Sequence, residues 1–203
     1  MILITIRHGE SSSNDSGITT GWMDVELTNE GLKQAEKVAE RLKDKKIDII
    51  YSSDLERAFR TAEEIAKFHS CKLILDERLR EQKKGKYEAG SGKKLWDDFR
   101  ASREDILEWI PEGGESMGKV KERVMDFLNE IEKKHKNKTV LIVSHGGVLA
   151  VISRHFYNDI EFDGKLDNKF GIRHKHKNTS VSQYSFDGTE WNVDIINCTG
   201  HLK

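Results

Sequence analysis

Four short segments of this sequence combine residues that can hold an anion with residues that can transfer a group or a proton. Arg7 and His8 stand together in "RHG", Arg57 lies in "SSDLER", Glu81 ends "RLRE", and His145 precedes two glycines in "SHGG". Arginine forms bidentate hydrogen bonds to phosphate and stays charged at neutral pH. Histidine and glutamate can serve as nucleophile and general acid. The set is therefore suited to phosphoryl transfer, where positioning and charge neutralisation supply most of the catalysis.

Each residue type has a distinct task in such a reaction. A neutral imidazole at His8 can attack phosphorus with one ring nitrogen, provided that a backbone carbonyl fixes the tautomer at the other. Gly9 would let the chain come close to the phosphate. Glu81 can protonate the leaving alkoxide, because the like charge of a phosphate dianion favours the protonated form of a neighbouring carboxyl group. No carboxylate cluster or cysteine–histidine spacing predicts a metal site, so we expect protein cations to take the place of magnesium.

Taken singly, these residues also have ordinary structural explanations. Arg57 can be a solvated helix residue, His8 a hydrogen-bonded structural histidine, Glu81 a surface carboxylate, and "SHGG" a tight turn after a strand. Their places relative to the predicted strands favour the functional interpretation, because the four segments are far apart in sequence yet follow strands that end at one edge of a sheet.

The predicted elements form an α/β domain. Nearly continuous apolar runs predict buried parallel strands, over residues 2–6, 47–52, 72–75 and 139–144. Segments of helical period predict amphipathic helices over residues 28–44, 54–69 and 115–135. Ser53 and Glu56 have the spacing of a capping box for the second helix, and residues 180–196 alternate as an antiparallel hairpin does. We therefore expect a three-layer α/β/α sandwich with a mostly parallel central sheet and one antiparallel hairpin at its edge.

Length and composition predict one domain over residues 1–203, since the chain has 203 residues with 36% hydrophobic content. Residues 79–114 are the least regular part, rich in glycine and lysine and holding the only proline, Pro111. We expect this segment to form a lid over one end of the sheet, with a helix at about residues 93–108.

Charge and cysteine content exclude several classes of partner. The 34 lysines and arginines nearly balance 35 acidic residues, so no general attraction to nucleic acid or to a membrane is expected, and any anion site must be local. No apolar run has the length of a membrane span, and "MILITIR" is too short for a signal peptide, which predicts a cytoplasmic protein. Cys71 and Cys198 lack metal or redox spacing and are expected to be reduced structural thiols.

Motifs along nearly the whole chain resemble the histidine phosphatase superfamily, which contains the cofactor-dependent phosphoglycerate mutases and related phosphatases. They occur in the family's order, as "RHGESSSN", "TTGWMDVELTNEGLKQA", "SSDLERAFRTAEEIA", "LREQKKGKYEAG", "PEGGESMGKVKERV" and "VSHGG". The resemblance implies a Rossmann-like, phosphoglycerate mutase-like fold. It also implies that His8 is the phosphorylated nucleophile, that Glu81 is the proton donor, and that Arg7, Arg57 and His145 form the phosphate pocket.

The same resemblance assigns further substrate contacts. Asn14, Thr20, Gly21 and the backbone of Gly146 match positions that contact phosphate or substrate in the family. Trp22, next to Gly21, is expected to be structural.

The branch within the superfamily depends on the residues after the acid. In the mutases Arg, His and Tyr usually follow it, and a later arginine pair binds the substrate carboxylate; this chain has Gln82, Lys83 and Lys84 and no adjacent arginines. The departure favours a metal-independent phosphomonoesterase that hydrolyses a small phosphorylated metabolite through a phosphohistidine, without a cofactor. A phosphoglycerate mutase primed by 2,3-bisphosphoglycerate is the alternative.

A third interpretation is a catalytically silent module that binds a phosphorylated ligand. Such modules usually lack the nucleophile or the acid, whereas both His8 and Glu81 are present here. The physiological substrate stays open, because the leaving-group contacts lie in the irregular segment, and a homodimer stays open as well.

Overall fold

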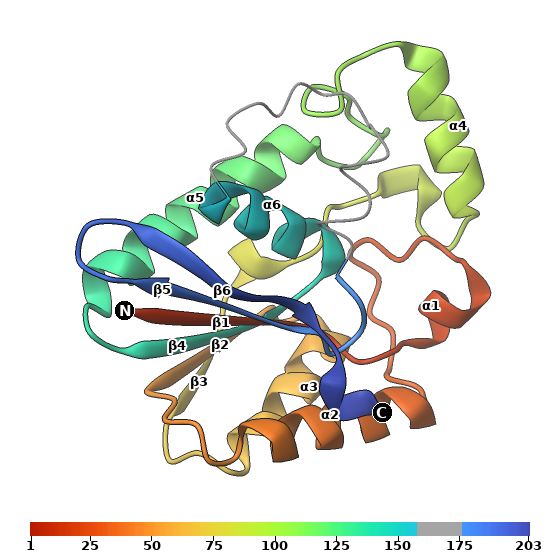
Figure 1. Cartoon of the computed structure of the whole chain (residues 1–203). Coiled ribbons are helices and arrows are strands. Elements are labelled where there is room, and N and C mark those ends of the chain that lie inside the picture. The colour runs from red at the N-terminus through yellow and green to blue at the C-terminus, as the bar shows by residue number, and fades with distance from the viewer. Residues whose placement is uncertain (158–175) are drawn as a thin grey trace.

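Six strands form one mixed sheet in the computed structural model, which describes residues 1–157 and 176–203 (Figure 1). Their order across the sheet is β3-β2-β4-β1-β5-β6. The parallel strands are β1 (Ile2–Arg7), β2 (Ile49–Ser52), β3 (Lys72–Leu75) and β4 (Thr139–Ser144), and β5 (Val181–Phe186) and β6 (Trp191–Cys198) form the antiparallel hairpin beside β1. The predicted mostly parallel sheet with an antiparallel edge pair is confirmed.

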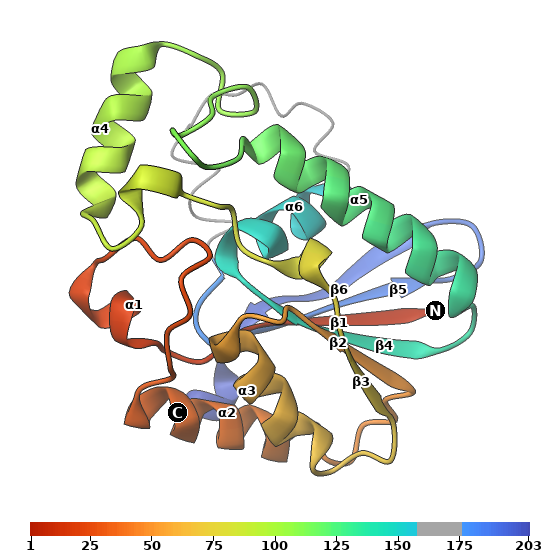
Figure 2. The ribbon, with the colours of Figure 1, turned by 180° about the vertical axis from the view of Figure 1, so that it is seen from behind.

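Helices cover both faces of this sheet, as the predicted three-layer arrangement requires (Figures 1 and 2). On one face lie α2 (Asn29–Leu42) and α3 (Glu56–Ala66), and on the other α5 (Met117–Lys134) and α6 (Gly146–Phe156). The three helices predicted from periodicity are α2, α3 and α5, each close to its predicted bounds.

Two apolar clusters, one on each face, explain why the strands are apolar throughout. In β1, Leu3 packs with α5 and α6, whereas Ile4 and Ile6 pack with α2 and α3. In β4, Ile142 and Leu141 alternate between the same two clusters. Successive side chains point to opposite faces of a strand, so a strand covered on both sides buries every residue.

The structure corrects three local predictions. Helix α6 was not predicted, because residues 148–152 form a continuous apolar run, in which a buried helix cannot be told from a buried strand. Strand β3 is not buried: it is the edge of the sheet, and Leu75 is 46% exposed. The capping box is also wrong, since α3 begins at Glu56 with Leu55 as its N-cap and without a side-chain cap.

The irregular segment 79–114 carries a short 3-10 helix, η2 (Gly85–Tyr87), and one α-helix, α4 (Gly92–Ser102), which is shorter than the predicted 93–108. It ends at Arg103, whose left-handed backbone (φ 58°) stops the helix. Aromatic rings from this segment pack on one another, with 5.3 Å between the ring centroids of Phe99 and Trp109. Figures 1 and 2 both show α4 beside the short helix α1 (Ser12–Ser16), at one end of the sheet. The Thr19 N–H donates to the Gly90 carbonyl at 2.9 Å and ties the two regions together.

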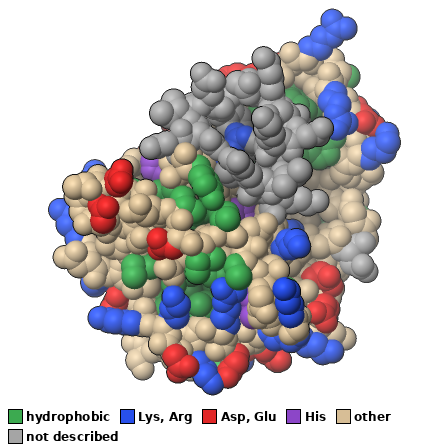
Figure 3. All heavy atoms as spheres, in the orientation of Figure 1, with side chains coloured by type: hydrophobic (Ala, Val, Ile, Leu, Met, Phe, Trp, Pro, Cys, Tyr) green, Lys and Arg blue, Asp and Glu red, His purple; other side chains and the backbone are tan. Residues whose placement is uncertain are grey.

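On the face in Figure 3, both acidic and basic side chains are exposed. Cys71 and Cys198 are free thiols. Within residues 1–157 and 176–203, none of the helices has the length and apolar character that a membrane span requires.

Gly9 has a packing role that the sequence did not reveal. A Cβ built at Gly9 would lie 2.5 Å from the carbonyl oxygen of Gly31 in α2. The clash is with backbone, which cannot rotate away as a flexible side chain can. The turn after β1 can therefore pack against α2 only because Gly9 has no Cβ.

We predict that Gly9→Ala lowers the free energy of unfolding by about 1–3 kcal/mol, the usual cost of overpacking a well-packed contact. Urea unfolding of the variant and the wild type measures this difference. Gly92→Ala is the matched control, because its Cβ would meet its nearest neighbours at 3.5 and 3.6 Å, an ordinary contact. Equal stability of Gly9→Ala and the wild type would contradict the packing explanation.

Candidate active site

Two histidines face each other where β1 and β4 end. The strands pair in parallel with Arg7 opposite Ser144, and the His8 N–H continues the ladder by donating to the Ser144 carbonyl at 3.0 Å. His8 and His145 follow these two strands, and their ring centroids lie 5.1 Å apart. His8 is only 4% exposed and His145 is fully buried. The parallel pairing therefore brings together two residues that are far apart in sequence.

The His8 ring is held in one tautomer. Its Nδ1 lies 2.7 Å from the Gly9 carbonyl oxygen, and because a carbonyl can only accept, Nδ1 carries the proton. In the neutral ring this leaves the lone pair on Nε2. Burial, followed by the charges of Arg7 and Arg57, holds the pKa of His8 well below its usual range. His8 is thus a neutral imidazole with an unprotonated Nε2, the form that a nucleophile needs.

Arg57, near the start of α3, is almost completely buried at 2% exposure. It donates from Nη1 to the Met23 carbonyl at 3.0 Å and from Nη2 to the Gly21 carbonyl at 2.9 Å. Burial, as the largest cause, lowers its pKa to about 10, so it keeps its charge at neutral pH. Arg57 therefore supplies a fixed positive charge and also holds the loop that follows α1.

Arg7 is the second cation of the site. Its Nη1 donates to the His176 carbonyl at 2.9 Å, and its buried Nε has no hydrogen-bond partner among the described residues. Burial lowers its pKa, while Glu81 opposes that shift. A Cβ added at Gly146 would lie 3.9 Å from the same Nε, so the first residue of α6 adjoins this side chain. An anion at this place would meet a guanidinium and the N-terminal end of a helix dipole.

His145 is anchored by a residue whose role the sequence did not reveal. Its Nε2 lies 2.9 Å from the Ser53 hydroxyl, which also accepts from the Leu55 N–H at 3.3 Å. Ser53, taken above for a helix cap, therefore supports the second histidine. Burial, followed by the charge of Arg57, holds the pKa of His145 well below its usual range.

Glu81 is held at both ends. Its carboxylate oxygens accept from the backbone N–H groups of Gln82, at 2.8 Å, and Gly147, at 3.1 Å. Its carbonyl accepts from Trp22 Nε1 at 2.7 Å and from Arg123 Nη2 at 3.1 Å. A Cβ at Gly147 would lie 2.4 Å from the Glu81 Oε1, so a side chain there would displace the carboxylate. Trp22 has the structural place expected of it, whereas Arg123 was missed.

The other predicted substrate contacts lie in the segment after β1. Asn14 is in α1, where its Oδ1 accepts from the Ser11 N–H at 3.2 Å. Thr20 donates from its hydroxyl to the Ser13 hydroxyl at 2.6 Å. Gly21 has a positive φ of 53°, and its carbonyl is bound by Arg57. Gly21 is thus bonded directly to Arg57, whereas Asn14 and Thr20 are linked to each other through the hydroxyl groups of Ser11 and Ser13.

Lys84 is a further cation near the proposed acid. Its Nζ donates to the Gln82 side-chain oxygen, and among the described residues no carboxylate lies within ion-pairing distance of it. Burial lowers the pKa of Lys84, against the opposing charges of Glu81, Glu115 and Glu88. In the sequence, Lys84 is marked only by its position three residues after Glu81, in a lysine-rich loop. No group of three or more potential metal ligands occurs in the part of the chain that the structure describes.

A sequence profile of the histidine phosphatase superfamily (branch 1) matches residues 3–199. The chain belongs to this superfamily. It is 36% identical to phosphoglycerate mutase-like protein 4 of Arabidopsis thaliana, over 99% of this chain and 86% of that protein. It is 34% identical to a metal-independent phosphoserine phosphatase of the same plant, over 99% and 83%. The structure of phosphoserine phosphatase from Entamoeba histolytica in complex with 3-phosphoglyceric acid superposes with a TM-score of 0.83, at 29% identity over 100% and 99% of the chains.

The two buried histidines should make this histidine phosphatase superfamily member less stable in acid. Their pKa values are lowered only in the folded state, so below about pH 6.5 the unfolded chain binds more protons. Their contribution is complete above that pH and is lost as the pH falls toward the folded-state pKa values. Each histidine contributes up to about 1.4 kcal/mol per pH unit to this loss.

We predict that His145→Asn reduces the slope of unfolding free energy against pH below 6.5 by up to about 1.4 kcal/mol per pH unit. Urea unfolding between pH 7.5 and 5 measures both slopes. Equal m-values of variant and wild type establish that the unfolding transitions are comparable. If the two pH slopes are the same, His145 is not neutral in the folded protein.

Proposed function

We propose that this chain is a metal-independent phosphatase that hydrolyses a small phosphorylated metabolite through a phosphohistidine at Nε2 of His8. The observation that carries the proposal is the neutral His8 ring, fixed by the Gly9 carbonyl and accompanied by Arg7 and Arg57. Membership of the superfamily and the likeness to a metal-independent phosphoserine phosphatase support it. No cofactor is part of the proposal, because the two arginines supply the positive charge that kinases obtain from magnesium.

The reaction has two steps. His8 Nε2 attacks phosphorus, the ester P–O bond breaks, and Glu81 gives its proton to the leaving oxygen. Glu81, now a carboxylate, takes a proton from water, whose oxygen attacks the phosphohistidine and releases inorganic phosphate and free His8. Arg7, Arg57, His145 and the Gly146 N–H stabilise the phosphoryl oxygens in both steps, and Asn14, Thr20 and Gly21 complete the pocket.

We place a carboxylate on the leaving group of the substrate. Lys84 offers an ammonium near Glu81 that no carboxylate of the described residues pairs with directly. A ligand carboxylate there would accept a charge-assisted hydrogen bond from the ammonium, which is stronger than a hydrogen bond between neutral groups. The relative named as a phosphoserine phosphatase and the structure bound to 3-phosphoglyceric acid concern substrates of this class.

The mutase alternative has less support. The amide of Gln82, where the mutases usually have arginine, donates to the Glu115 carbonyl at 2.7 Å and is buried. A silent binding module is disfavoured because both the nucleophile and the acid are present. We further propose one domain over residues 1–203 with residues 79–114 as its lid, a cytoplasmic location, and no nucleic acid or membrane partner, which the near-neutral charge supports.

We predict that His8→Ala abolishes phosphate release and abolishes a covalent phosphoryl adduct that is acid-labile and base-stable. Labelled substrate, rapid quenching and mass measurement of the protein detect the adduct. His69→Ala is the control, because His69 follows α3 and lies outside the site; it should keep both turnover and adduct. EDTA present throughout should leave the wild-type rate unchanged. Turnover by His8→Ala at the wild-type rate would refute the assignment of the nucleophile.

We predict that Glu81→Gln slows hydrolysis of an alkyl phosphate by about 100- to 10,000-fold, the range typical of general acid catalysis. An aryl phosphate should lose less, because a nitrophenolate leaves without much help from a proton. Steady-state rates on both substrates measure the difference.

Glu88→Gln is the matched control for this prediction. The Glu88 carboxylate accepts from the Trp22 and Lys84 backbone N–H groups, at 3.0 and 2.9 Å, so its loss should affect both substrates alike. Equal losses on the two substrates in Glu81→Gln, together with lower thermal stability, would show that Glu81 anchors the lid and that another group is the acid.

A further inference from the structure

A strained residue lies directly against the proposed nucleophile. Thr179 is buried and has a φ of 51°, a left-handed conformation that a β-branched residue rarely adopts. Its N–H donates to the Arg7 carbonyl at 3.0 Å and lies 3.4 Å from the His8 carbonyl. Such strain costs on the order of 1–3 kcal/mol and persists only where the surroundings determine the backbone.

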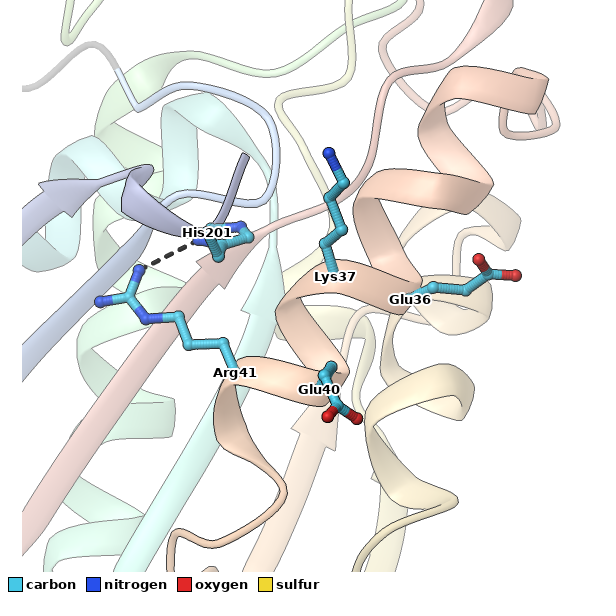
Figure 4. A pocket seen from close by; sticks show the side chains of 5 residues that line it. All are labelled: Glu36, Lys37, Glu40, Arg41 and His201. Carbon is cyan, nitrogen blue, oxygen red and sulfur yellow. Dashed lines mark hydrogen bonds between the residues drawn. The ribbon is translucent and has the colours of Figure 1, made fainter. Parts of the chain in front are cut away.

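The side chain of Thr179, in the turn before β5, is connected through His201 to helix α2. The Thr179 hydroxyl lies 3.2 Å from His201 Nε2. The other ring nitrogen of His201, Nδ1, lies 3.0 Å from Nη1 of Arg41 in α2 (Figure 4). Burial, followed by the charges of Arg41 and Lys37, lowers the pKa of His201 to about 4, so the ring is neutral and can link the two groups. In the turn before β5, the Thr179 side chain therefore contacts His201, while the Thr179 backbone N–H bonds to the end of β1.

Asn178, the preceding residue, reaches two predicted site residues with one amide group. Its Nδ2 donates to the His8 carbonyl at 3.0 Å and to the Asn14 Oδ1 at 3.1 Å. An amide nitrogen has two hydrogens, so both are used. Asn178 thus couples the backbone of the nucleophile to a side chain of α1.

This contact determines which end of the Asn14 amide is available to a ligand. The Oδ1 of Asn14 accepts from the Ser11 N–H at 3.2 Å as well as from Asn178, and neither donor can accept a hydrogen bond. If the amide were rotated by 180°, its own N–H groups would face both donors. The Oδ1 therefore points toward Ser11 and Asn178, and the Nδ2 of Asn14 remains as the donor for a phosphate oxygen.

We propose that Asn178 is a positioning residue for phosphoryl transfer, which fixes the His8 backbone and turns the amide of Asn14 so that it donates to the phosphate. The proposal rests on the proposed function, because it assumes that Asn14 contacts the phosphoryl group. Asn178 itself acts through Asn14 and His8 rather than on the substrate.

The test compares Asn178→Ala and Asn14→Ala with the double variant. Asn178→Ala should lower kcat/KM for p-nitrophenyl phosphate by about 10- to 100-fold, because the Asn14 amide would lose its hydrogen bond to the charged phosphate. It should weaken binding of inorganic phosphate, measured by calorimetry. In the Asn14→Ala background the same substitution should cost at least threefold less, because its partner is already gone. A purely structural residue would cost the same in both backgrounds.

Asn197→Asp provides the matched control. Asn197 Oδ1 accepts from the Lys177 N–H at 2.9 Å, and an aspartate oxygen can do the same, so activity should be kept. Asn178→Asp makes the same chemical change but replaces a donor by an acceptor that faces the His8 carbonyl and Asn14. It should lose at least as much activity as Asn178→Ala.

Equal costs of Asn178→Ala in the two backgrounds, or full activity of Asn178→Asp, would overturn the proposal. Failure of the proposed function has a different signature. A wild type that binds phosphate but hydrolyses no ester would refute the phosphatase, while the phosphate affinities of the four proteins still decide whether Asn178 acts through Asn14. A wild type without phosphate affinity would overturn both proposals.

Discussion

The parallel pairing of β1 with β4 is the constraint on which the site depends. Arg7 lies opposite Ser144, and the following N–H of His8 still bonds to the Ser144 carbonyl at 3.0 Å. Because side chains alternate along a strand, a slip of one residue would turn each apolar side chain to the other face and separate the two histidines. The apolar clusters on both faces set this register, so the packing of the core and the geometry of the site are determined together.

The central place of β1 has a second consequence, because its other neighbour is β5. The end of β1 therefore receives support from two sides. His145 and the start of α6 come from the β4 side, and Asn178 and Thr179 come from the β5 side. A residue at the end of a central strand can be held by backbone hydrogen bonds on both sides, which an edge strand such as β3 could not provide.

Because the end of β1 is enclosed in this way, the charged and titratable side chains of the site are buried close together. Burying Arg57 and Arg7 costs free energy, which hydrogen bonds to the carbonyls of Gly21, Met23 and His176 partly offset. The histidines respond by staying neutral, since a third or fourth positive charge in the same volume would be much less favourable. The site is consequently preorganised for a dianion, because its positive charge is fixed before any ligand binds.

The sequence predicted those parts of the fold in which a residue type has one usual role, such as apolar residues in buried strands. Apolar runs bounded by charged residues located the parallel strands, and the residues that follow them marked the edge that carries the site. It was uninformative where a contact depends on tertiary pairing. Ser53 has the local spacing of a helix cap, yet its hydroxyl faces a histidine from another strand. Asn178 precedes a hairpin in an ordinary polar run, and only the pairing of β5 with β1 brings it to His8.

This difference between local patterns and tertiary contacts also explains why motifs indicate the reaction more readily than the substrate. The residues proposed to hold the phosphoryl group sit on strand ends and helix starts, whose positions the core fixes. Glu81 is different: its carbonyl is bound by Trp22 and Arg123, while its carboxylate accepts only short backbone contacts from Gln82 and Gly147 within the described residues. The bond from Trp22 ties the backbone at Glu81 to the loop that Arg57 holds, because Trp22 lies between Gly21 and Met23. The Lys84 side chain, by contrast, is bound to Gln82 within its own loop, so the residue that we propose to contact the leaving group is less tightly tied to the anion site than Glu81 is.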